Sequence, residues 1–174
     1  EFSFTSGNVG VATGSKSVIT LNLNRIIQDT RTEFNSMFGE GTSADFMAYL
    51  RGTLENVLER IYHYHVAYNE LLKDLVDNDM MPAYSEGYIN LRQQFLTIGI
   101  NGLNEAAEFL GMTCNDNKEY EGFCRLITST ISEQNREHQT KELKFNTEFV
   151  PAEGLGVKNY NWDKQDGYVV PKDR

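Results

Sequence analysis

The hydrophobic pattern of this chain predicts three strands. Residues 18–24 and 145–150 alternate between apolar and polar side chains, as a half-buried strand does. The short apolar run Phe95–Ile100 has the length and composition of a buried strand. Each predicted strand therefore has at least one face that packs against other elements.

Between these strands the period changes to three or four residues, which predicts helices over 25–38, 103–110 and 115–140. Apolar residues recur with the same period from Ala44 to about Asp77, so we expect one long amphipathic helix there. Asn24 is a suitable N-cap for the first helix and Gly111 a suitable C-cap for the helix over 103–110. Long helices between strands favour parallel crossover units, so the fold class is α/β.

The last predicted strand carries the clearest candidate site. Period two sets Asn146 and Glu148 on one face. Pro151 cannot donate to a ladder and should end the pairing, and Gly154 and Gly156 then allow the backbone amides to approach a ligand closely. The simpler alternative is a strand end followed by a surface turn.

Other motifs carry weaker signals. Gly10–Ser17 has the glycines of a phosphate-binding loop in the wrong register, and it precedes a strand instead of a helix. Cys114 and Cys124 fit neither a zinc knuckle nor a redox pair, and are expected to be reduced and partly buried. His63 and His65 point to opposite sides of their helix and cannot chelate one metal ion, and His138 is expected at the surface.

Composition narrows the class of partner. The chain has 174 residues and a formal net charge of −9. The negative charge argues against nonspecific binding to nucleic acid or to an anionic membrane. The chain starts at Glu1 and has no signal peptide or apolar run of about 18 residues, so we expect an internal fragment of a cytoplasmic protein.

Three motifs resemble one enzyme family in the same order. Phe145–Gly154 (Phe-Asn-Thr-Glu-Phe-Val-Pro-Ala-Glu-Gly) resembles the Asn-x-Glu-x-x-Pro-Ala-Glu segment of anaerobic, glycyl-radical ribonucleoside-triphosphate reductases. Ile19–Ile26 is similar to their Thr-Ile-Asn-Leu-x-Arg-Ile strand, and Ile98–Ala106 to their Ile-Gly-x-x-Gly-Leu-x-Glu-Ala turn. The three motifs span nearly the whole chain.

The resemblance implies that residues 1–174 form one segment from the second half of a ten-stranded α/β barrel with long crossover helices. Members of the family convert ribonucleoside triphosphates to 2′-deoxyribonucleotides. A glycyl radical generates a cysteine thiyl radical, and formate or a dithiol protein is the reductant. The implied partners are the rest of the reductase chain, a radical-SAM activating enzyme and a second copy in a homodimer.

The resemblance also implies residue roles. Asn146 and Glu148 would be catalytic, gripping the ribose hydroxyls, with Glu148 carrying a proton as the 2′-hydroxyl departs. Asn22 would line the substrate cavity, which leaves Asn24 as a helix cap. The substrate triphosphate would lie against Pro151, Ala152, Glu153, Gly154 and Lys158.

Two departures limit the resemblance. The radical cysteine loop and the Arg-x-x-Gly-Tyr segment are absent, since Gly167-Tyr168 lacks the arginine. By itself the segment should therefore be inactive. The glycine-leucine turn also resembles oxygen-dependent and cobalamin-dependent reductases, and a non-enzymatic acidic helical interaction module is the alternative. Buried strands would favour a barrel, and disordered ones the module.

Overall fold

A computed structural model describes residues 14–150 and 154–171. Three parallel strands, β1 (Ser15–Asn22), β2 (Phe95–Asn101) and β3 (Lys144–Phe149), form one sheet in the order β1-β2-β3. The register pairs Ile19 with Ile98, and Ile98 with Thr147. The predicted α/β class with parallel crossovers is confirmed.

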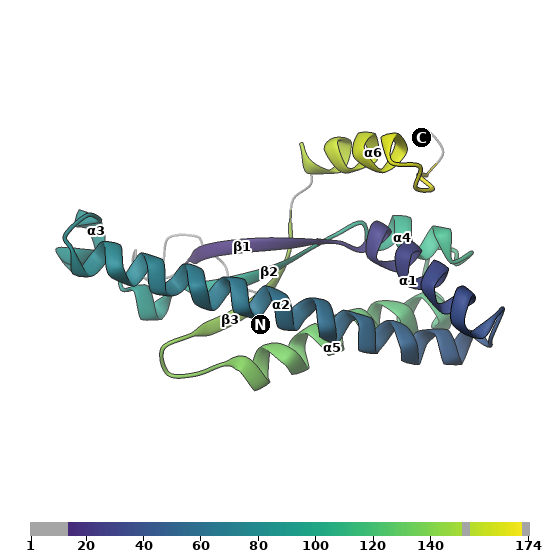
Figure 1. Ribbon diagram of the computed structural model, residues 1–174, viewed down its shortest axis with the longest axis horizontal. Coiled ribbons are helices and arrows are strands. Elements are labelled where there is room, and N and C mark those ends of the chain that lie inside the picture. Colours follow the sequence, from purple (N-terminus) through teal and green to yellow (C-terminus); the bar gives the residue numbers. More distant parts are fainter. Residues whose placement is uncertain (1–13, 151–153, 172–174) are drawn as a thin grey trace.

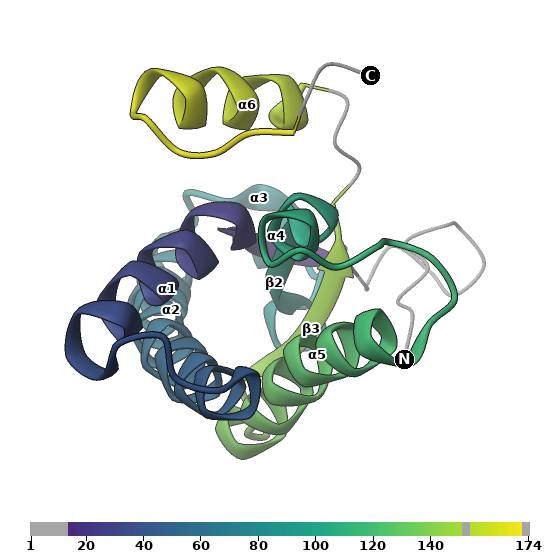
Figure 2. The ribbon, with the colours of Figure 1, turned by 90° about the vertical axis from the view of Figure 1, so that its right-hand side faces the viewer.

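Helices fill the connections between the strands (Figure 1). The first crossover contains α1 (Leu23–Phe38), the 35-residue α2 (Ser43–Asp77), the short α3 (Pro82–Ser85) and the 3₁₀ turn η1 (Leu91–Gln93). The second contains α4 (Leu103–Phe109) and α5 (Lys118–His138), and α6 (Leu155–Gln165) follows β3. Viewed end-on, α1, α2 and α5 lie around one side of the sheet, while α6 lies beyond α4 (Figure 2).

The core lies between the sheet and these helices. Leu96, Ile98 and Ile100 project from β2 toward the helices and are almost completely buried. Their helical partners are fully buried: Ile27, Phe46, Leu50, Leu54, Leu58, Ile127 and Ile131. Burying each aliphatic side chain contributes about 1.5–3 kcal/mol, so the strands are as integral to the fold as the helices.

Several predicted boundaries and contacts were wrong. The first strand begins at Ser15, three residues earlier than expected, and α1 begins at Leu23, two residues earlier than expected. Its N-cap is Asn22, whose Oδ1 accepts from the Arg25 amide at 3.3 Å, and not Asn24. Helix α5 begins at Lys118, three residues later than expected, because the Asn117 side chain caps that helix.

The positions of the three histidines agree with the predictions in part. His65 is completely buried and its Nε2 lies 3.2 Å from the carbonyl oxygen of Thr97, whereas the side chain of His63 is 76% exposed. Their opposite orientation is confirmed. His138 is half-buried and not a simple surface residue, because it stacks on Tyr62 at 3.9 Å between ring centroids.

Gly99 in the middle of β2 makes room for its neighbours. A Cβ added there would lie 2.5 Å from the Thr20 hydroxyl oxygen and 2.7 Å from a Val150 methyl group. Gly99→Ala is therefore expected to lower the free energy of unfolding by about 1–3 kcal/mol. Gly52→Ala is the control, because nothing lies within 4 Å of its added Cβ in α2, and alanine there should stabilise by about 0.5–1 kcal/mol. Urea unfolding measures both changes. Equal changes in the two variants would contradict the close contact of Thr20 and Val150 with Gly99.

Candidate functional site

The sheet face that turns away from α1, α2 and α5 carries a line of polar side chains. Thr97 on β2 donates its hydroxyl to Asn146 Oδ1 at 2.6 Å, and Asn146 Nδ2 donates to Glu148 Oε1 at 3.0 Å. The hydroxyl of Ser15 on β1 contacts that of Thr97. The predicted pair of Asn146 and Glu148 is thus brought together, joined by two residues that sequence reasoning did not select.

Strand geometry explains why these groups meet. Asn146 and Glu148 are two residues apart on β3, and the parallel register places Thr97 directly beside Asn146. Thr97 is completely buried, while Asn146 and Glu148 are half-buried. The buried hydroxyl fixes the Asn146 carbonyl oxygen, and that orientation in turn aims the amide nitrogen at Glu148.

The line has unused hydrogen-bonding capacity. Asn146 has a second amide hydrogen and Glu148 a second carboxylate oxygen. Within the described residues, neither group has a further hydrogen bond beyond those above. A half-buried amide donor beside a carboxylate suits a ligand that presents hydroxyl groups, because the amide can donate to one and the carboxylate can accept from another.

A second polar cluster lies where the strands end. Asp163 on α6 is 2% exposed and accepts from Asn22 Nδ2 at 3.2 Å, Asn24 Nδ2 at 2.8 Å and Arg25 Nε at 2.5 Å. Arg25 also donates to Asp166 at 2.7 Å. The hydrogen bonds to Asp163, and then those to Asp166, raise the pKa of Arg25. This cluster fastens α6 across the carboxyl end of β1.

Both polar atoms of the Asn22 side chain therefore have structural partners. Its oxygen caps α1 and its nitrogen binds Asp163. It also lines a small cavity of about 50 Å³ together with Asn101, Gly102 and Gly156. A space of this size holds water molecules and not a nucleotide.

The sequence predicts that Gly154 and Gly156 belong to a loop whose backbone amides approach a ligand. This is wrong for the local structure, because Gly154 is the N-cap of α6 and Gly156 lies within the helix. The first turn of a helix presents backbone N–H groups that have no acceptor within the helix, and the helix dipole favours an anion there. Lys158 lies exposed in this turn, with its own amide donating to Gly154 O at 3.2 Å. Pro151, Ala152 and Glu153 lie outside the described residues.

Gly167 is exposed in a left-handed turn, and the neighbouring Tyr168 hydroxyl donates to Asp29, so this pair does not fit a radical glycine held away from water. Residues 14–150 and 154–171 contain no group of three or more His, Cys, Asp or Glu side chains that could hold a metal ion. Cys114 and Cys124 form no disulfide and lie outside the strands that carry the polar line.

A larger hollow, of about 330 Å³, opens at the end of the sheet where the strands begin. Its lining includes Leu91 and Arg92, just before β2, and Glu142, just before β3. It contains none of the predicted site residues. No helix in the part of the chain that the structure describes is long and apolar enough to cross a membrane.

Comparisons with known proteins agree on one family. The family model described as anaerobic ribonucleoside-triphosphate reductase matches residues 2–173. The anaerobic ribonucleotide reductase from Thermotoga maritima with glycerol in the active site is 27% identical, with a TM-score of 0.74 over 87% of this chain and 24% of that one. The same enzyme in complex with dATP and CTP is 25% identical, with a TM-score of 0.71 over 91% of this chain and 26% of that one.

The chain thus spans about a quarter of the length of these solved structures. A comparison with curated proteins finds no match. The interaction-module alternative is not supported, because the family model covers nearly the whole chain and the strands are ordered, with β2 buried.

Proposed function

Because this chain belongs to the anaerobic ribonucleoside-triphosphate reductase family, we propose that it forms part of the catalytic barrel of such a reductase. Its three parallel strands would be a portion of a ten-stranded barrel completed by the rest of the reductase chain. Residues 1–174 then act as one segment that supplies a wall of the substrate cavity. The whole enzyme would convert ribonucleoside triphosphates to 2′-deoxyribonucleotides in the cytoplasm.

The observation that carries this proposal is the hydrogen-bonded pair of Asn146 and Glu148 on the sheet face that the helices leave uncovered. In the proposal, the second amide hydrogen of Asn146 donates to a ribose hydroxyl oxygen. The second carboxylate oxygen of Glu148 accepts from the neighbouring hydroxyl. Glu148 then takes the proton of that hydroxyl and delivers it to the 2′-hydroxyl oxygen as the C2′–O bond breaks and water leaves, which is a usual role for a positioned carboxylate.

The triphosphate would lie at the start of α6. The segment from Pro151 to Gly154 leads into this helix, whose first amides favour an anion, and Lys158 adds positive charge one turn later. Glu153 would repel a phosphate, so its carboxylate is expected to face hydroxyls or a structural partner. Asn22, at the carboxyl end of β1, remains a proposed substrate contact.

Parts outside this segment would supply the radical chemistry. They include the glycyl radical, the cysteine that it oxidises, a radical-SAM activating enzyme and either formate or a dithiol protein as reductant. We also propose a homodimer of the full chain. The residues of this segment would bind the substrate, orient it and move one proton.

The test is an anaerobic assay of the full-length protein that contains this segment. The protein is activated by its radical-SAM partner, its glycyl radical is verified by electron paramagnetic resonance, and CTP is supplied with formate or with a reduced dithiol protein. Formation of dCTP is expected with one of the two reductants. Radical-loaded protein that forms no deoxynucleotide from any of the four ribonucleoside triphosphates would contradict the proposal.

A further inference from the structure

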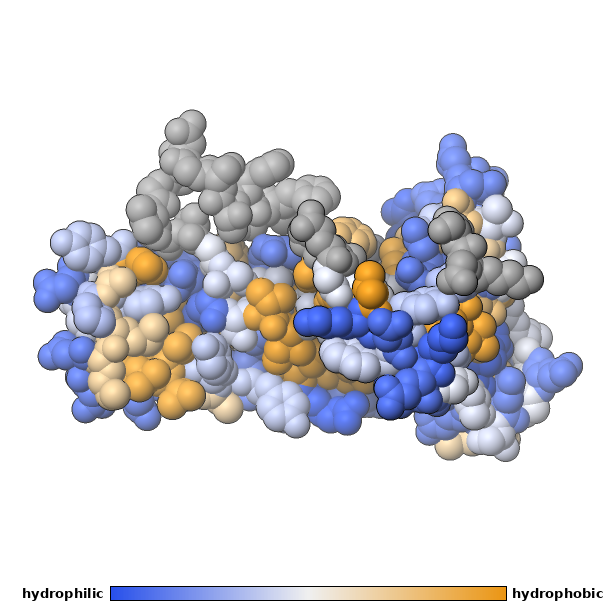
Figure 3. Space-filling view, turned by 90° about the horizontal axis from the view of Figure 1, so that it is seen from above, coloured by the Kyte–Doolittle hydropathy of each residue, from blue (hydrophilic) through white to orange (hydrophobic). Residues whose placement is uncertain are grey.

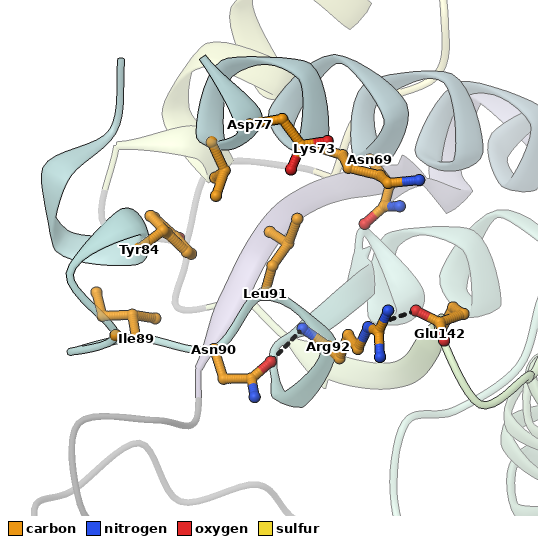
Figure 4. A pocket seen from close by; sticks show the side chains of 11 residues that line it. Asn69, Lys73, Asp77, Tyr84, Ile89, Asn90, Leu91, Arg92 and Glu142 are labelled. Atoms are coloured by element: carbon orange, nitrogen blue, oxygen red, sulfur yellow. Dashed lines mark hydrogen bonds and ion pairs between the residues drawn. The ribbon is translucent and has the colours of Figure 1, made fainter. Parts of the chain in front are cut away.

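The hollow of about 330 Å³ has the size and lining of a small-molecule site. It lies between the carboxyl-terminal turns of α2, the segment from α3 to η1, and the loop before β3 (Figure 4). Apolar side chains form one wall: Val76, Tyr84, Ile89 and Leu91. In the space-filling view, hydrophobic surface gathers at the end of the molecule where α3 lies (Figure 3).

Charged side chains form the other wall. Lys73 and Arg92 line the hollow together with Asp77 and Glu142. Arg92 Nε binds Glu142 Oε2 at 2.6 Å, which leaves its terminal nitrogens to contact a ligand. Among the described residues no ion pair is formed by Lys73, although Asp77 is one helical turn away. Within the described residues this ammonium group is therefore not held at ion-pair distance by a carboxylate.

A third cation lies against the lining residues. Lys16 Nζ donates to Asn69 Oδ1 at 2.6 Å and to the carbonyl oxygen of Leu91 at 3.0 Å. Burial lowers the pKa of Lys16, and the nearby Glu142 opposes this effect. Two cations and two carboxylates line the hollow, and Lys16 lies against that lining. Within the described residues Lys16 and Lys73 form no ion pair, and these two ammonium groups favour an anionic ligand.

The walls are held in place without a ligand. Asn90 Oδ1 accepts from the Arg92 amide at 3.0 Å, and the hydroxyl of Tyr84 donates to Gln94 Oε1 at 2.7 Å. These contacts hold the aromatic ring of Tyr84 and the backbone of Arg92 on neighbouring sides of the hollow. A preorganised site loses less side-chain entropy when a ligand binds.

We propose that this hollow binds a small organic anion. The apolar body of the ligand packs against Tyr84, Ile89 and Leu91, and its carboxylate or phosphate group binds Lys73 and the terminal nitrogens of Arg92. The site lies at the opposite end of the strands from the start of α6, so it is distinct from the proposed substrate site.

The experiment uses the full-length protein and three probes that share a phenyl ring: phenyl phosphate, phenylacetate and benzyl alcohol. Isothermal titration calorimetry is expected to show saturable binding of at least one anion, and no saturable binding of the neutral alcohol. The better of the two anions tells whether the site prefers phosphate or carboxylate. Binding of the alcohol as tightly as the anions would overturn the proposal, as would the absence of binding by both anions.

Lys73→Gln is the diagnostic variant, because Lys73 forms no ion pair with another described residue whose loss would disturb the fold. It is expected to weaken anion binding about tenfold, equivalent to about 1.4 kcal/mol. Lys118→Gln is the matched control, because Lys118 is exposed at the start of α5 and does not line the hollow. An anion that binds equally well to both variants does not occupy this hollow, and that result would also overturn the proposal.

Discussion

If the full-length protein reduces CTP as proposed, Glu148→Gln is expected to lower its kcat about 10²-fold to 10⁴-fold, the usual range for loss of a general acid or base. Glutamine has the same shape, and its carbonyl oxygen can still accept from Asn146 Nδ2 where Glu148 Oε1 does now, at 3.0 Å. The line from Thr97 to residue 148 is therefore preserved. What the variant loses is a group that can accept and return a proton.

The control for this prediction is Glu119→Gln, which removes the same charge from an exposed position in the first turn of α5. Single-turnover kinetics under anaerobic conditions separate the chemical step from CTP binding. We expect the control to keep wild-type kcat. If both variants keep kcat within threefold of the wild-type value, Glu148 does not transfer the proton.

Asp163→Ala is expected to release α6 from the carboxyl end of β1. The substitution leaves Asn22, Asn24 and Arg25 without their common acceptor, and breaking a buried charge pair in this way costs about 3–5 kcal/mol. If that energy stabilises α6 locally, a loss of about 3 kcal/mol corresponds to more than a hundredfold faster amide exchange over residues 155–165.

Hydrogen exchange read by mass spectrometry on the full-length protein measures this effect segment by segment. Asp166→Ala is the matched control: it also removes a partner of Arg25, but from an exposed carboxylate, for which a loss below about 1 kcal/mol is expected. Equal exchange in the two variants would mean that the buried carboxylate of Asp163 does not hold α6 in place.

The fold was predictable where the hydrophobic pattern is strong. β2 is buried on both faces and reads as a continuous apolar run, and the apolar stripe of α2 persists over its 35 residues. Within that helix Tyr68 is 42% exposed, while Leu58 and Tyr62 are buried. Whether a residue near the edge of a helix face is buried depends on which neighbour packs there, and periodicity alone does not predict this.

The pattern failed where tertiary contacts decide the local structure. α6 has weak apolar periodicity and includes Gly156, and sequence reasoning assigned no helix there. Its position depends on Asp163, whose three partners are about 140 residues away in the chain. The N-cap of α1 was misplaced for the same reason, because Asn24 is buried against Asp163 and Val169 and leaves the cap to Asn22.

The candidate site was half predictable. Period two within one strand is enough to bring Asn146 and Glu148 together, and the structure confirms their contact. The hydroxyl of Thr97 belongs to another strand, and it meets Asn146 only because of the register between β2 and β3. A single sequence specifies the face of a strand but not which residue of the next strand lies beside it.

The most direct test of the account is an experimental structure of the full-length reductase with CTP bound. We expect Asn146 and Glu148 within hydrogen-bond distance of the ribose hydroxyls, and the triphosphate at the first turn of α6. CTP bound with its ribose away from the uncovered face of β3, while both side chains keep only their present protein partners, would contradict the proposed site.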